Sequence, residues 1–100
     1  MGKTNRAALA RDLHELAAFY GWRRHDHTGR TSEGHSDGFP AEVLLRGERL
    51  LFVEFTDGRG VLIPPAREWF AALAAVSAID TFVLGPDDAE ALAQMLSVPA

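Results

Sequence analysis

The chain of 100 residues contains no cysteine, which excludes a disulfide framework and a thiolate metal site. It also lacks any apolar run near the ~20 residues that a membrane-spanning helix needs, so we expect no membrane partner. No apolar signal core follows Met1, which favours a cytoplasmic protein. Basic residues are in the minority, with ten Lys and Arg against fourteen Asp and Glu, and the formal net charge is −4. Dedicated nucleic-acid binders normally have a basic surface, so a protein partner is the better expectation than DNA.

What remains is the composition of an ordinary globular domain. The chain is 47% hydrophobic and 24% charged, which is typical of folded proteins. A chain of this length fills only one hydrophobic core. We therefore expect residues 1–100 to form a single domain.

The first part of the chain predicts a helix and a polar strand. Apolar residues recur with helical spacing from Leu9 to Tyr20, and Gly21 is placed to end this helix. Residues 22–27 predict a polar strand. Residues 28–38 are rich in Gly, Ser and Thr, so they predict a mobile loop.

The middle of the chain predicts a hairpin and a helix. Residues 43–45 and 50–55 are apolar and flank a short polar turn, so we expect two largely buried strands. Residues 57–60 predict a further turn. Pro64 and Pro65 are suited to the first turn of a second helix. We expect the apolar face of that helix to comprise Trp69, Phe70, Leu73 and Val76.

The last part predicts a strand and a helix. Residues 81–84 predict a short buried strand, and residues 85–88 begin a final helix with acidic residues at its N-terminus. The packing positions of this helix are Leu92, Met95 and Leu96. Strands separated by helical crossovers predict an α/β domain with a four-stranded mixed sheet flanked by helices, in the order α-β-β-β-α-β-α.

Two segments in the middle of the chain carry a resemblance to a known family. They are Gly38-Phe39-Pro40-Ala41 and Glu54-Phe55-Thr56. Together with further residues in matching order and spacing, they make the chain from about residue 6 to residue 96 similar to small PD-(D/E)XK nuclease domains of the VRR-NUC type. Those further residues are Gly21-Trp22, Gly58-Arg59-Gly60, Trp69 and Leu73. The resemblance implies a restriction-endonuclease-like core, in which two carboxylates hold Mg²⁺ or Mn²⁺ and a lysine assists the attacking water.

The residues that would carry this chemistry are mostly replaced. Ala41 stands at the place of the first carboxylate and Thr56 at the place of the lysine, so that only Glu54 remains. Arg6 and Ala66 stand where family members tend to carry a glutamate and a glutamine. The resemblance therefore implies a catalytically inactive nuclease fold without catalytic residues, a metal or another cofactor.

Neighbouring charged residues leave two alternatives open. Asp37 could join Glu54 and hold Mg²⁺ or Mn²⁺, which would make the protein an endonuclease with a relocated ligand. Glu42 is unsuited to that role, because strand alternation directs it to the opposite face of the sheet. Glu54 is otherwise a strand-end acid that pairs with Arg49 or Arg59.

A short segment rich in Arg and His gives two candidate binding sites. One is a phosphate-binding cluster, for which a solvated strand edge is the alternative; it comprises Arg23, Arg24, His25, His27 and Arg30. The other is a zinc or nickel site, for which solvated histidines are the alternative. Its ligands would come from His25, Asp26, His27, His35 and Asp37.

Loss of catalytic groups leaves binding as the expected function. Val61, Leu62 and Ile63 follow a turn and predict an exposed interaction patch, with local burial as the alternative. We expect Trp22 and Trp69 to pack in the core or in an interface, and a homodimer stays open. The resulting hypothesis is a phage or mobile-element protein that modulates a host protein by binding it. DNA binding without cleavage is the other non-enzymatic alternative.

Overall fold

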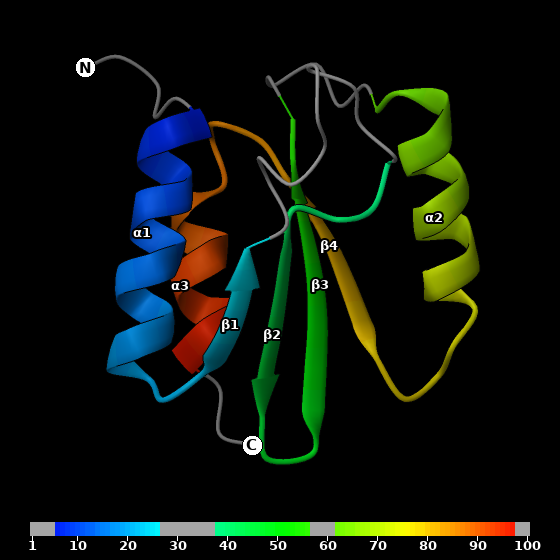
Figure 1. Ribbon diagram of the computed structural model, residues 1–100. Helices are drawn as coiled ribbons and strands as arrows, with labels where there is room; N and C mark the ends of the chain where they lie inside the picture. The colour runs from blue at the N-terminus through cyan, green and yellow to red at the C-terminus, as the bar shows by residue number, and fades with distance from the viewer. Residues whose placement is uncertain (1–5, 27–37, 57–61, 98–100) are drawn as a thin grey trace.

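The computed structural model describes residues 6–26, 38–56 and 62–97, and these form three helices and four strands (Figure 1). The elements are α1 (Arg6–Phe19), β1 (Arg23–Asp26), β2 (Glu42–Arg46), β3 (Arg49–Phe55), α2 (Pro64–Ala74), β4 (Asp80–Leu84) and α3 (Ala89–Ser97). This is the order predicted from the sequence. The loop expected up to Gly38 and the turn expected over 57–60 lie outside the described residues, apart from Gly38 itself.

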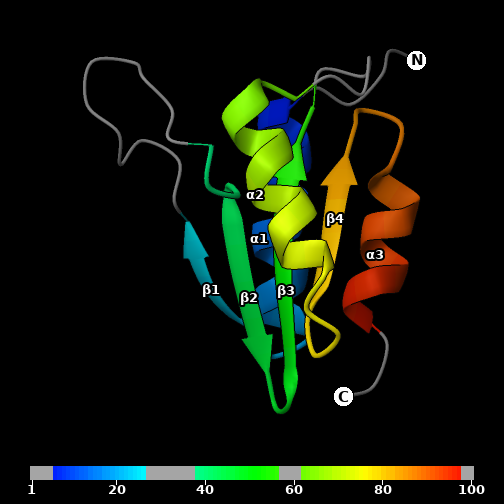
Figure 2. The same ribbon diagram turned by 90° about the vertical axis from the view of Figure 1, so that its right-hand side faces the viewer.

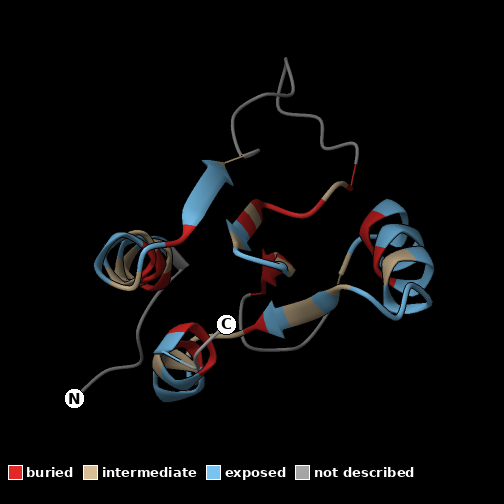
Figure 3. Ribbon diagram, turned by 90° about the horizontal axis from the view of Figure 1, so that it is seen from below, coloured by how far each residue is buried: buried red, intermediate tan, exposed pale blue. Residues whose placement is uncertain are grey.

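The four strands form one mixed sheet in the order β1-β2-β3-β4. Strand β2 is antiparallel to both β1 and β3, and β4 runs parallel to β3 after the crossover through α2. Helices α1 and α3 cover one face of the sheet and α2 lies on the other, as the view along the strands shows (Figure 3). Turned by 90°, the molecule shows α2 in front of the sheet and α1 behind it (Figure 2). The α/β class and the mixed, helix-flanked sheet are therefore confirmed.

The main core lies between the sheet and the α1–α3 layer. On the sheet side it is built from alternate residues of β2 and β3, because alternate side chains of a strand share one face. The predicted packing positions of α3 are all buried there, as are Leu9, Leu13 and Ala17 of α1, and Leu16 and Tyr20 are partly buried against this core. The fully buried leucines of this core are Leu9, Leu13, Leu44, Leu51, Leu92 and Leu96.

Trp22 joins the ends of α1 and α3 within this core. Its indole Nε1 donates a hydrogen bond to the carbonyl of Leu96 at 2.9 Å. Arg46 donates to the carbonyls of Leu96 and Tyr20, each at 3.2 Å, and its guanidinium lies 4.4 Å from the centroid of the Trp22 ring. The carbonyls at a helix C-terminus have no partner within the helix, so these donors satisfy them. Trp22 is thus a packing residue, as expected.

Strand β4 differs from the buried strand that the sequence predicts. Leu84 is buried, but Val83 is 41% exposed and Asp80 is also exposed. As the last strand of the sheet, β4 has a neighbouring strand on one side only. The run of three apolar residues at 82–84 therefore predicted the strand correctly, but the expectation that the whole strand is buried is wrong.

Helix α2 buries only part of the predicted apolar face. Its buried residues are Ala66 and the predicted Phe70, which are one turn apart, and the predicted Leu73 is partly buried. Trp69 is 41% exposed, and Val76 lies beyond the end of the helix and is 47% exposed. The helix ends at Ala74, so the apolar face expected to run on to Val76 is shorter than the sequence pattern suggests.

Candidate functional site

The positions that the resemblance assigns to nuclease chemistry lie where β2 begins, β3 ends and α2 starts. The register that pairs Glu42 with Val53 brings Ala41, just before β2, beside the end of β3 that carries Glu54. Gly38 packs against the first turn of α2, which carries Ala66. The four positions are only 3 to 9% exposed; they are Ala41, Glu54, Thr56 and Ala66.

Glu54 is the one carboxylate among these four positions. Its Oε2 accepts a hydrogen bond from the backbone N–H of Phe55 at 3.0 Å. The alternative pairing with Arg49 is wrong, because alternation places Arg49 and Glu54 on opposite faces of β3. Arg49 instead reaches Asp80 at 3.4 Å. Arg59 and Asp37, the other residues considered as partners of Glu54, lie outside the described residues.

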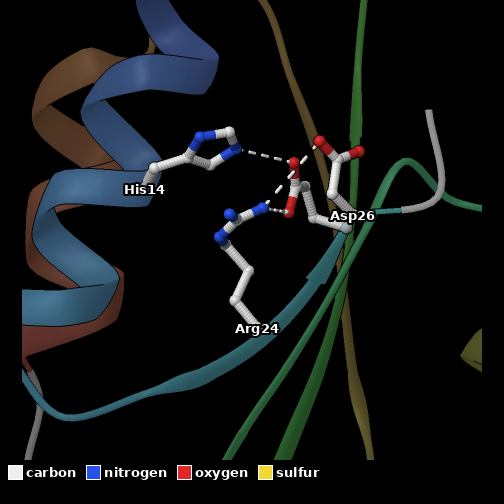
Figure 4. Close-up of polar contacts among 4 residues, drawn as sticks. His14, Arg24 and Asp26 are labelled. Atoms are coloured by element: carbon white, nitrogen blue, oxygen red, sulfur yellow. Dashed lines mark hydrogen bonds and ion pairs between the residues drawn. The ribbon is translucent and has the colours of Figure 1, made fainter. Parts of the chain in front are cut away.

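Glu42 points toward α1, as strand alternation predicts, since it contacts His14 of that helix. It is the centre of a polar cluster with His14, Arg24 and Asp26, the three residues that Figure 4 labels. Its Oε2 lies 3.0 Å from Nε2 of His14, and its Oε1 accepts a hydrogen bond from Nη1 of Arg24 at 3.1 Å. The same Arg24 nitrogen is 3.9 Å from Oδ2 of Asp26. The side chain of Glu42 is only 2% exposed, and a buried carboxylate of this kind needs such partners.

The sequence pattern did not predict His14 as a member of this cluster. A usable signal was present in β2, because Glu42 has the same strand parity as the buried Leu44 and must therefore be a buried carboxylate. The identity of its partner depends on how α1 is rotated over the sheet. Residue spacing alone does not determine that rotation.

The basic segment around β1 is divided between the two faces of the sheet. Arg24 and Asp26 face α1, where Arg24 pairs with Glu42. Arg23 and His25 are exposed and alternate with them, so they face the side of α2. The described part of the expected phosphate-binding cluster is therefore not one patch, and His25 and Asp26 do not share a metal site. His27, Arg30, His35 and Asp37 lie outside the described residues.

Helix α2 packs mainly against β4, so no helix within the described ranges covers the α2 side of β1 and β2. Leu45 is 43% exposed there, opposite Arg23 on β1. Phe39 packs edge-on against Trp69, with ring centroids 4.9 Å apart, and a hollow of about 210 Å³ adjoins Trp69 along α2. We call this surface the open face; it comprises Arg23, His25, Phe39, Leu45 and Trp69.

Part of the predicted apolar patch before α2 is exposed. Ile63 is 48% exposed and directly precedes the helix, whereas Leu62 is half-buried. The carbonyl of Leu62 accepts a hydrogen bond from Arg67 at 3.1 Å. Val61 lies outside the described residues. The described part of this segment therefore has one exposed apolar side chain.

Comparison of the chain with protein-family models, with curated proteins and with solved structures finds no match. Among the described helices, none is long and apolar enough to cross a membrane. The function is therefore inferred from the arrangement of the side chains.

Proposed function

We propose that the chain is a catalytically inactive protein of the PD-(D/E)XK nuclease fold that binds a macromolecular partner. The observation that carries the proposal is that four of the five family positions, namely Ala41, Glu54, Thr56 and Ala66, are buried and include only one carboxylate, Glu54. A catalytic Mg²⁺ or Mn²⁺ requires several oxygen ligands and room for water. Ala41, Thr56 and Ala66 supply neither a carboxylate nor an amine.

The open face is the surface we assign to the partner. It combines aromatic and aliphatic side chains with an arginine at one edge, and interface cores are enriched in aromatic residues and arginine. Phe39 supports Trp69 from one side and lies 6.0 Å from Phe52 of β3, centroid to centroid. A tryptophan held by packing loses little conformational freedom when a partner covers it.

The distribution of charge supports a protein partner over DNA. Of the two arginines on β1, Arg24 faces α1 and is bound to Glu42. Arg23 is then the one arginine that the described strand β1 directs to the open face. The net charge of −4 disfavours phosphate as a ligand. A phage or mobile-element protein that modulates a host protein would need only this binding activity.

Affinity capture from host extract tests the open face with a matched pair of variants. Leu45→Glu places a charge on the part of the face that β2 contributes, where Leu45 is 43% exposed, whereas Phe19→Glu places the same charge on α1, where Phe19 is 79% exposed. We expect the wild type and Phe19→Glu to retain the same protein, and Leu45→Glu to lose it by about tenfold or more, as for an interface hot spot. Equal capture by the wild type and Leu45→Glu would refute the open face. If only Phe19→Glu failed to capture the protein, the interface would lie on α1 and not on the open face.

Nuclease activity and DNA binding are tested separately. Supercoiled and branched DNA should stay intact with the wild type in Mg²⁺ or Mn²⁺. Cleavage that disappears in Glu54→Ala would establish the relocated nuclease in place of the inactive fold. A gel shift at low salt that Arg23→Ala removes would make DNA the partner.

A further inference from the structure

Three potential metal ligands converge on the α1 side of the sheet, away from the open face. They come from three elements: His14 from α1, Asp26 from β1 and Glu42 from β2. One imidazole nitrogen and two carboxylate oxygens, one from each residue, lie within 4.8 Å of one another. Figure 4 shows the side chains of His14 and Asp26 approaching from opposite sides. Atoms this close need only small side-chain movements to reach one shared ion.

The burial of the three residues suits an ion that enters from solvent. The Glu42 side chain is 2% exposed, and its strand is in the middle of the sheet, so it provides a fixed ligand. His14 and Asp26 retain 34% and 37% of their side-chain exposure. The cluster therefore has one rigid ligand and two that remain accessible.

Arg24 supports the ligand geometry without occupying all of it. It binds Oε1 of Glu42, while Oε2 is the atom that faces His14. The Nη1 atom of Arg24 lies 3.9 Å from Oδ2 of Asp26, which is long for a hydrogen bond. Glu42 and Asp26 contribute two carboxylates beside the one guanidinium of Arg24. A cation between His14 and Asp26 would therefore be attracted, with Arg24 acting as an outer partner of Glu42.

We infer that His14, Asp26 and Glu42 bind a divalent transition metal ion, Zn²⁺ or Mn²⁺. An imidazole with two carboxylates suits these ions, whereas Mg²⁺ prefers oxygen ligands alone. The bound ion ties α1 to the β1–β2 side of the sheet and stabilises the fold. This site lies on the opposite sheet face from Glu54 and uses none of the histidines that the sequence pattern proposed.

Calorimetric titration of the purified protein with ZnCl₂ and with MnCl₂ tests the inference. Wild-type protein should bind one equivalent of at least one ion, and an equal concentration of MgCl₂ should not compete. His14→Ala should weaken binding at least about 100-fold, since loss of even an outer partner costs 10- to 100-fold. The matched control is His25→Ala, which removes an exposed histidine on the other face and should bind as the wild type does.

A second pair of variants separates this site from the remaining histidines. The triple variant His25→Asn, His27→Asn, His35→Asn retains His14 and should keep the wild-type affinity. Asp26→Asn should lose affinity as His14→Ala does, and circular dichroism checks that both are folded. Binding that survives His14→Ala and disappears in the triple variant would overturn the site. Absence of Zn²⁺ and Mn²⁺ binding to the wild type at millimolar concentrations would also overturn it.

Discussion

Gly38 packs against the first turn of α2, and replacing it with alanine tests that contact. Its φ of +83° lies in the left-handed region, and an added Cβ would come within 2.5 Å of the Pro65 carbonyl carbon and 2.6 Å of the Ala66 nitrogen. Both are backbone atoms, so neither can rotate away. The left-handed conformation costs an alanine about 1–2 kcal/mol, and overpacking adds about 1–3 kcal/mol. We therefore expect Gly38→Ala to lower the free energy of unfolding by about 2–5 kcal/mol.

Gly21 provides the matched control. Its φ is +81°, but no heavy atom lies within 4 Å of an added Cβ. Gly21→Ala should therefore lower the free energy of unfolding only by the cost of the left-handed conformation, about 1–2 kcal/mol. Urea denaturation of both variants measures the two losses, provided that the slope of the free energy against urea is unchanged. Equal losses would refute the close approach of Gly38 to α2.

Two other contacts give predictions measured by the same denaturation experiment. Glu42→Gln keeps the side-chain volume but removes the charge facing Arg24, and it should cost about 1.5–3 kcal/mol, the range for hydrogen bonds to charged groups; a loss of only a few tenths would show that this pair contributes little to stability. Trp22→Phe removes the indole donor to the carbonyl of Leu96 and should cost about 1 kcal/mol. The cost of Trp22→Phe should rise in an Arg46→Ala background, because the carbonyl then loses both side-chain donors; equal costs in the two backgrounds would contradict the shared acceptor.

The elements of the fold were predictable because each has a local signature. The spacing of Leu92, Met95 and Leu96 predicted the buried face of α3, and the apolar runs around residues 46–48 predicted the hairpin. Burial was less predictable. The exposure of Val83 depends on β4 being the last strand of the sheet, and that of Val76 on where α2 ends. Both depend on tertiary neighbours that a short apolar run does not specify.

The contacts of the polar side chains were also only partly predictable from the sequence. Strand alternation alone could have separated Arg23 from Arg24, because neighbouring residues of a strand face opposite ways. It did not reveal the contact between His14 and Glu42, which joins residues 28 positions apart. That contact requires both the register of β2 and the rotation of α1. The nuclease identity of the residues around Glu54 stays a prediction.

The hydrogen bond from Trp22 to Leu96 joins residues 74 positions apart, which has a consequence for biosynthesis. The ribosome releases α1 and the first three strands well before α3. Until then, the apolar stripe of α1 and the facing side of the sheet have no helix to cover the space that Leu92 and Leu96 later fill. The nascent chain therefore cannot complete its core before α3 has been synthesised. Chaperones that bind exposed apolar segments have their main opportunity in that interval.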